Sequence, residues 1–160
     1  MTFISSFTFP QGTWLDQSQA PYSTLELTQG WVIIYSYPKD HTPGCTRQAC
    51  ILRDMWSKWA DLSVTLFGLS ADSIDSHHTF ATQNQLPFPL LSDPELILCK
   101  ALGIWGEQQW KEHRYMGLER STWIFLNGQI KASFRHVHID GHWDEVWEKW
   151  NELASSLDID

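Results

Sequence analysis

The stretch WVIIYSYPKDHTPGCTRQAC, residues 31–50, contains the two patterns that decide the fold. Residues 31–37 form a short run of β-branched and aromatic side chains, which is typical of a strand buried on both faces and central in a sheet. Thr42 then suits a helix N-cap, and Pro43 suits the first helical turn. Apolar residues follow at three- and four-residue spacing, which predicts an amphipathic helix over residues 42–62. These residues are Leu52, Met55, Trp56 and Trp59.

Strand-like and helix-like segments alternate in the next part of the chain. Strands are expected at about 63–70 and around Leu90, and helices at 73–85 and shortly after Pro94. This alternation predicts a largely parallel sheet that is covered on both faces.

The last part of the chain predicts an antiparallel addition to that sheet. Residues 121–126 and 131–137 are strand-like and flank Asn127-Gly128, the strongest hairpin signal in the sequence. A final helix is expected from residue 140 or 141. With 160 residues, of which 42% are hydrophobic, the chain can bury one substantial core. We therefore expect a single α/β domain over residues 1–160, with a central mixed sheet flanked by helices.

The bulk composition argues against two classes of partner. The formal net charge of -8 disfavours a polyanion such as nucleic acid. No stretch approaches the roughly 18 consecutive apolar residues of a membrane span, and residues 1–14 lack the basic and apolar regions of a signal peptide. A cytoplasmic protein without membrane contact is expected.

The three cysteines do not suit a structural disulfide framework, because they are few and odd in number. Cys45 falls in the first turn of the predicted helix, where free backbone N–H groups and the positive end of the helix dipole favour a negative charge. This position favours the thiolate, which is the nucleophilic form of cysteine.

Cys50 lies five residues after Cys45 and on a different face of an ideal helix. Five helical residues separate the two Cα atoms by roughly 9 Å, beyond the limit of about 7 Å for a disulfide. A bond between these sulfurs would therefore require the first helical turns to unwind.

Other interpretations of the cysteine pair compete. A lone cysteine at a helix end is most often a small buried apolar residue. Metal binding through His41, Cys45 and Cys50 is disfavoured, because the spacing does not match the two-residue spacer that is common in zinc sites. The same mismatch counts against a protein thiol-disulfide oxidoreductase. A non-enzymatic redox sensor with the same disulfide switch stays open.

The segment PKDHTPGCTRQAC, residues 38–50, resembles the active-site segment of peroxiredoxins, and specifically the Q-type branch, also called bacterioferritin comigratory proteins. The shared pattern of Pro, three residues, Thr, two residues and Cys is met by Pro38, Thr42 and Cys45. The branch commonly places a second cysteine five residues on, as Cys50 is here. The likeness continues at LRD (52–54), PLLSD (89–93), GIWG (103–106) and Arg120-Ser121-Thr122.

The resemblance implies a thioredoxin-like fold with peroxiredoxin insertions and a thiol peroxidase that uses no cofactor. Cys45 would attack hydrogen peroxide or an organic hydroperoxide and become a sulfenic acid. Thr42 would hydrogen-bond the peroxide, Pro38 would shield the sulfur, and Arg120 would stabilise the negative charge. Gln48 would orient that arginine.

The resemblance also implies how the cycle closes. Cys50 would resolve the sulfenic acid as an intramolecular disulfide, and thioredoxin or a related dithiol protein would reduce it. The branch is often monomeric, so a monomer is expected.

The remaining cysteine and the histidines suggest structural roles. Cys99 lies on a short apolar segment and is expected in the core. The pair His77-His78 is expected on a solvated helix surface. The segment HVHIDGH, residues 136–142, has three histidines, but strand alternation and a helix start separate them, which disfavours a metal site.

Overall fold

The computed structural model describes residues 7–158, and it is organised around a seven-stranded sheet of order β2-β1-β5-β4-β3-β8-β9. Strand β3 (Trp31–Ser36) is central, parallel to β4 (Val64–Ser70) and antiparallel to β8 (Ser121–Leu126). Its side chains alternate between two cores, with Tyr35 on one face and Ile34 on the other, both completely buried. The predicted central, doubly buried strand is confirmed.

The sheet is mixed, as expected, but it is less parallel than the alternation of strands and helices predicted. Only β3, β4 and β5 (Leu90–Ser92) run parallel to one another among the described strands. The short strand β1 (Thr13–Leu15) joins β5 antiparallel and carries β2 (Pro21–Ser23) at the edge. At the other edge, β8 and β9 (Gln129–Phe134) form an antiparallel hairpin.

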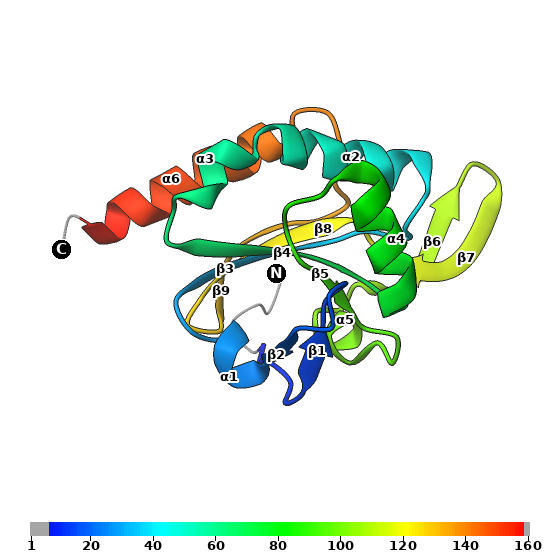
Figure 1. Ribbon diagram of the computed structural model, residues 1–160, viewed down its shortest axis with the longest axis horizontal. Helices are drawn as coiled ribbons and strands as arrows, with labels where there is room; N and C mark the ends of the chain where they lie inside the picture. Colours follow the sequence, from blue (N-terminus) through cyan, green and yellow to red (C-terminus); the bar gives the residue numbers. More distant parts are fainter. Residues whose placement is uncertain (1–6, 159–160) are drawn as a thin grey trace.

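Helices cover both faces of this sheet, and the division is visible in Figure 1. Four helices lie on one face, and two short helices lie with the β1–β2 hairpin on the other. The first group is α2 (Pro43–Asp54), α3 (Trp56–Ala60), α4 (Ile74–Asn84) and α6 (His142–Asp158); the second is α1 (Thr24–Leu27) and α5 (Ile97–Ala101).

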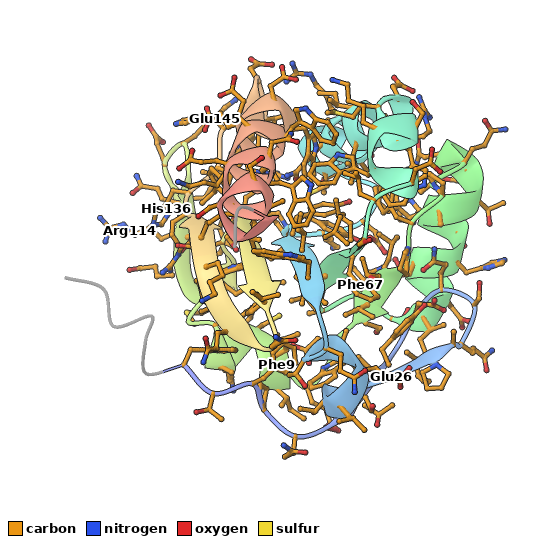
Figure 2. The ribbon with its side chains drawn as sticks, turned by 90° about the vertical axis from the view of Figure 1, so that its left-hand side faces the viewer. Phe9, Glu26, Phe67, Arg114, His136 and Glu145 are labelled. Atoms are coloured by element: carbon orange, nitrogen blue, oxygen red, sulfur yellow. The ribbon has the colours of Figure 1, made fainter. Side chains whose placement is uncertain are left out.

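Each face of the sheet has its own hydrophobic core. The core under α2 and α6 includes Cys45 and Trp143, and the opposite core includes Phe9 and Phe67. Figure 2 shows Phe9 and Phe67 inside the molecule, whereas the exposed Glu145 extends outward from α6. Burial of apolar side chains on both faces is the main stabilising contribution to such a sheet.

Two element boundaries differ from the predictions. The helix expected over residues 42–62 is interrupted at Met55, which has φ −108° and ψ 15°, so α2 and α3 are separate. The three- and four-residue spacing of apolar side chains continues through Met55. The sequence pattern therefore gives no sign of the break. Strand β9 begins directly after Asn127-Gly128, two residues earlier than expected, because both turn residues adopt positive φ, as tight two-residue hairpins require. It ends at Phe134, three residues before the expected end at Val137.

A second hairpin was not predicted at all. Strands β6 (Trp105–Trp110) and β7 (His113–Leu118) form a separate two-stranded sheet that extends from the body of the molecule (Figure 1). Most of its residues are at least partly exposed on both faces, so no alternation of apolar and polar residues marks it. Within residues 7–158, no helix has the length and apolar character needed to cross a membrane.

Candidate active site

Cys45 lies in the first turn of α2, the helix that follows the central strand β3 in the chain. Thr42 has the extended backbone of an N-cap, and Pro43 opens the helix, as the sequence predicted. Cys45 exposes 1% of its surface and packs in the core beside Leu52, which is also completely buried. Its sulfur is thereby shielded from bulk water and held at the helix end that favours a negative charge.

The guanidinium of Arg120 contacts this sulfur. Nη2 of Arg120 lies 3.5 Å from Cys45 Sγ, and Nη1 donates a 2.6 Å hydrogen bond to Gln48 Oε1. The carbonyl of Gln48 in turn accepts a 3.0 Å hydrogen bond from Trp143 Nε1. A positive charge at this distance stabilises negative charge on the sulfur, and the planar guanidinium is fixed by two partners at once.

Gly44 makes room for this contact. A Cβ atom on Gly44 would lie 3.3 Å from Arg120 Nη2 and 3.4 Å from Ile139 Cδ1. Both distances are tight for carbon, so a side chain at residue 44 would press against the guanidinium.

Thr42, three residues before Cys45, and Pro38 border a pocket. The hydroxyl of Thr42 donates a 2.9 Å hydrogen bond to the Lys39 carbonyl and does not cap a helix N–H group. Both residues line a cavity of about 340 Å³ whose opposite wall comes from the β6–β7 hairpin. The apolar residues of that wall are Trp105, Tyr115, Met116 and Leu118.

Cys50 lies on the same continuous helix as Cys45, and both are free thiols. It is half-buried, and its Sγ lies 3.7 Å from Asn84 Oδ1 at the end of α4. The face that an isolated helix would turn to solvent is therefore partly covered by α4.

Glu119, the residue directly before Arg120, is a buried carboxylate paired with the exposed Arg135. Glu119 is 4% exposed, and its carboxylate accepts hydrogen bonds from Arg135 and from the backbone N–H of His136. Burial by itself would raise the pKa of Glu119, but these hydrogen bonds outweigh it and lower that pKa. The backbone next to Arg120 is thus linked to the segment that directly follows strand β9.

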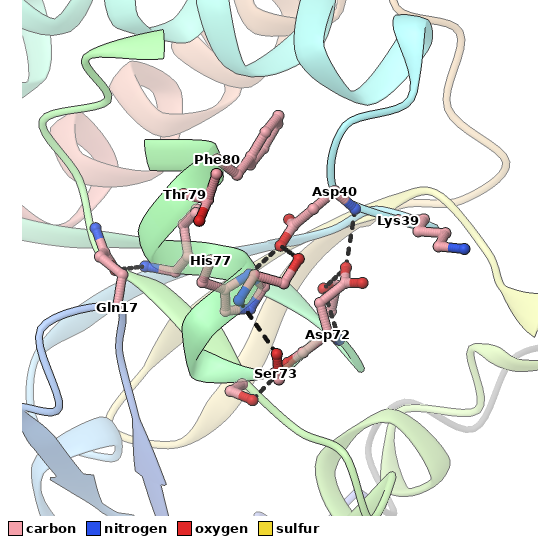
Figure 3. A network of polar contacts seen from close by, with 12 residues as sticks. Gln17, Lys39, Asp40, Asp72, Ser73, His77, Thr79 and Phe80 are labelled. Atoms are coloured by element: carbon pink, nitrogen blue, oxygen red, sulfur yellow. Dashed lines mark hydrogen bonds and ion pairs between the residues drawn. The ribbon is translucent and has the colours of Figure 1, made fainter. Parts of the chain in front are cut away.

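A second buried network lies below the loop that connects β3 to α2 (Figure 3). The carboxylate of Asp40 lies 2.7 Å from His77 Nδ1, and both side chains are fully buried. The backbone N–H of Asp40 donates to Asp72 Oδ2 at 2.9 Å. His77 was expected on a solvated surface, and this expectation is wrong. Its spacing of three and four residues from the buried Phe80 and Ala81 was the signal that placed it on the inner face.

The Asp40, Asp72 and His77 side chains bring potential metal-ligand atoms within 4.8 Å of one another. The hydrogen bonds of His77 do not fit a metal ligand. Nε2 of His77 lies 3.1 Å from the Leu91 carbonyl, which can only accept, and Nδ1 faces the Asp40 carboxylate. Both ring nitrogens therefore already face hydrogen-bonding partners within the protein.

The remaining cysteine and the histidines of residues 136–142 differ in burial. Cys99 is completely buried, as expected, and burial together with the nearby Asp93 carboxylate raises the pKa of its thiol strongly. His136 and His138 are exposed, whereas His142 is buried with Nε2 at 2.7 Å from the Thr122 hydroxyl. Burial first, and the Arg120 charge second, lower the pKa of His142 to about 4.

Sequence reasoning singled out Pro38, Thr42, Cys45 and Arg120. The structure places Arg120 against the Cys45 sulfur, and Pro38 and Thr42 on the wall of one pocket. Cys50 lies against α4. The sequence analysis missed the Asp40–His77 pair and the pocket wall from the β6–β7 hairpin. No local signal pointed to the wall, because its residues face the site only through tertiary structure.

A mixed sheet with a cysteine in the first turn of the helix after its central strand, and an arginine against the sulfur, defines a thiol-based oxidoreductase with a thioredoxin-like fold. A family model described as AhpC/TSA family matches residues 4–133. The putative peroxiredoxin bcp of Coxiella burnetii is 41% identical over 116 residues, which cover 72% of this chain and 77% of the relative. The peroxiredoxin Bcp of Bacillus subtilis is 35% identical, with 78% and 80% covered.

Solved structures agree with these relatives. Peroxiredoxin Q of Xanthomonas campestris superposes with a TM-score of 0.82 at 28% identity, covering 89% of this chain and 91% of the other. The bacterioferritin comigratory protein of the same organism also gives a TM-score of 0.82, at 26% identity, with 93% and 99% covered. The chain belongs to the AhpC/TSA family and, within it, to the peroxiredoxins of the Bcp or Q type. It is therefore a thiol peroxidase, an antioxidant enzyme that uses a peroxide and a thiol reductant.

Proposed function

We propose that Cys45 is the peroxidatic cysteine and that its thiolate attacks the terminal oxygen of a hydroperoxide. The S–O bond forms as the O–O bond breaks, and water or an alcohol leaves after taking up a proton. Cys45 becomes a sulfenic acid. The observation that carries this assignment is the 3.5 Å contact between Arg120 Nη2 and Cys45 Sγ.

The neighbouring groups have distinct roles in this step. Negative charge moves from sulfur to the leaving oxygen, so a fixed guanidinium at the sulfur stabilises the transition state more than the ground state. The Thr42 hydroxyl donates its hydrogen bond to the Lys39 carbonyl. The oxygen lone pairs of Thr42 are therefore free to accept a hydrogen bond from the O–H of the peroxide. Pro38, half-buried at the pocket edge, restricts the access of water.

Cys50 resolves the sulfenic acid. Its thiolate attacks the Cys45 sulfur, the S–O bond breaks as the disulfide forms, and the departing hydroxide takes up a proton and leaves as water. Both cysteines lie on the intact helix α2, with roughly 7.5 Å of rise between them, so this step needs α2 to unwind locally. A dithiol protein such as thioredoxin then reduces the disulfide by thiol exchange.

Organic hydroperoxides suit the site in addition to hydrogen peroxide. The pocket beside Thr42 has an apolar wall that includes Trp105 and Met116, which can cover the alkyl group of a substrate. The related bacterioferritin comigratory protein of Xanthomonas campestris is described as having alkyl peroxide reduction activity. The pocket supports the same substrate class for this chain.

Stopped-flow oxidation by hydrogen peroxide with Cys45→Ser and Cys50→Ser variants tests the proposal. Cys45→Ser should abolish turnover with a thioredoxin system as the reductant. Cys50→Ser should still consume one equivalent of peroxide and then stop, with a sulfenic acid that reacts with dimedone. A Cys45→Ser variant with full turnover would refute the assignment. Slow oxidation of the wild-type protein without catalytic turnover would instead indicate a redox sensor.

A further inference from the structure

Asp40 ties the active-site loop, residues 38–42, to helix α4. Its carboxylate accepts hydrogen bonds from the Tyr37 hydroxyl at 2.6 Å and the Ser76 hydroxyl at 2.8 Å, in addition to the 2.7 Å contact with His77. Figure 3 shows the side chains of Asp40 and His77 pointing toward each other from the loop and from α4. The loop is therefore fixed two residues before Thr42 and five residues before Cys45.

The Asp40–His77 contact is a fully buried, hydrogen-bonded pair. The two ring nitrogens of His77 face the Asp40 carboxylate and the Leu91 carbonyl. Burial alone would raise the pKa of Asp40, but the hydrogen bonds from His77, Tyr37 and Ser76 outweigh it, and the pKa is lowered. Removing one member of such a pair leaves an uncompensated group in the protein interior, which is strongly unfavourable.

The loop also holds a strained residue directly after this anchor. His41 has φ +67°, a left-handed conformation that costs a residue with a side chain of the order of 1 kcal/mol or more. His41 lies between Asp40 and Thr42, and its ring packs edge-on against Phe80 at 5.4 Å. Strain of this kind persists only where the surrounding contacts fix the backbone. Release of Asp40 would allow His41 to relax and the first turn of α2 to open.

We propose that the buried Asp40–His77 pair stabilises the closed conformation of the active-site loop, in which Cys45 reacts with peroxide, against the unwound conformation in which Cys45 and Cys50 form a disulfide. Asp40 and His77 are thus positioning residues, and they act through the loop rather than on the substrate. The inference rests on the proposed function, because it assumes the two-cysteine cycle.

The experiment separates the two half-reactions. Oxidation of Cys45 is measured in the Cys50→Ser background, and disulfide formation after a peroxide pulse is measured with both cysteines present. Asp40→Asn and His77→Gln should slow the oxidation of Cys45 about tenfold or more, as expected when a buried pair is broken. The same substitutions should speed disulfide formation several-fold, and amide exchange of residues 45–53 in the reduced protein should become faster.

A matched control removes a buried carboxylate elsewhere. Asp93 is 2% exposed and accepts hydrogen bonds from Trp14 Nε1 and the Cys99 backbone N–H, away from the active-site loop. Asp93→Asn should lower the global stability but leave the ratio of the two rates unchanged. Opposite changes in the two rates are a result that general destabilisation does not produce.

Ser76→Ala provides a milder variant in case Asp40→Asn does not fold. It removes one 2.8 Å hydrogen bond to Asp40 and should shift the two rates in the same opposite directions, by a smaller factor. The inference is wrong if Asp40→Asn, His77→Gln and Ser76→Ala change the ratio no more than Asp93→Asn does. If Cys45→Ser retains turnover, the proposed function fails instead.

Discussion

Arg135 holds Glu119 through two hydrogen bonds, of 2.6 Å from Nε to Oε2 and 2.7 Å from Nη2 to Oε1. Glu119 is buried directly before Arg120, whose guanidinium lies against the Cys45 sulfur. A bidentate contact of this kind fixes both side chains and the backbone segments that carry them. The position of Arg120 therefore depends in part on the neighbouring Glu119–Arg135 pair.

Glu119→Gln should lower the free energy of unfolding at pH 7 by about 1–3 kcal/mol, because the buried hydrogen bonds lose their charge. The pKa of Glu119 is lowered in the folded state from its usual value of 4.5, so its stabilising contribution is present above that pH and is lost as the pH falls. Urea unfolding at pH 7, 5 and 3.5 should show a shallower acid loss in the variant. Glu152→Gln, at an exposed pair on α6, should change neither value.

Gly44→Ala should slow peroxide oxidation several-fold without a matching loss of stability. The added Cβ would press on Arg120 Nη2 at 3.3 Å and displace it from the sulfur. Alanine is favoured over glycine in a helix by up to about 1 kcal/mol, which offsets the crowding. Rates come from stopped-flow kinetics and stability from urea unfolding. Gly106→Ala, where a Cβ meets no atom within 4 Å, is the control and should leave the rate unchanged.

Met116→Ser should reduce kcat/KM for cumene hydroperoxide about three- to tenfold and leave hydrogen peroxide unaffected, because one apolar contact to the substrate is lost. Met116 lines the pocket beside Thr42 and is 57% exposed, so the fold should tolerate the change. Trp110→Ser is the matched control, since Trp110 is 60% exposed on the same hairpin and does not line the pocket. Equal losses for both peroxides would contradict the assignment of this wall.

His142→Gln should flatten the loss of stability between pH 6.5 and about 4. The pKa of His142 falls from 6.5 to about 4 on folding, mainly through burial and secondarily through the Arg120 charge. The unfolded chain therefore binds more protons in this window, and stability declines as the pH drops, by roughly 3 kcal/mol in total. Unfolding measured at several pH values checks this slope. The exposed His78 on α4 offers a control substitution with no expected effect on it.

The sequence was most informative where local patterns and tertiary structure agree. Strand β3 could be predicted because burial on both faces leaves a continuous apolar run, and the β8–β9 hairpin could be predicted from Asn127-Gly128. The first turn of α2 was marked by Thr42 and Pro43. The residues around the Cys45 sulfur followed from a motif whose chemistry requires them close together.

The sequence was least informative where distant segments meet. The β6–β7 hairpin is exposed on both faces, so no alternation of apolar and polar residues predicts it. Its turn at Lys111 also lacks a glycine or asparagine. The break at Met55 falls inside an unbroken apolar spacing. The buried contact between Asp40 and His77 joins residues 37 positions apart, and only the packing of α4 on the sheet reveals that His77 faces inward.

The hydrogen bond from the Trp143 indole to the Gln48 carbonyl gives the protein a built-in optical reporter. Gln48 lies between the two sulfurs on α2, so the environment of this indole changes whenever that stretch of backbone leaves the helix. If α2 unwinds during turnover as proposed, the emission of Trp143 should follow that change without any added dye. Trp143→Phe should remove that part of the fluorescence signal. Turnover of this variant is then followed by peroxide consumption alone.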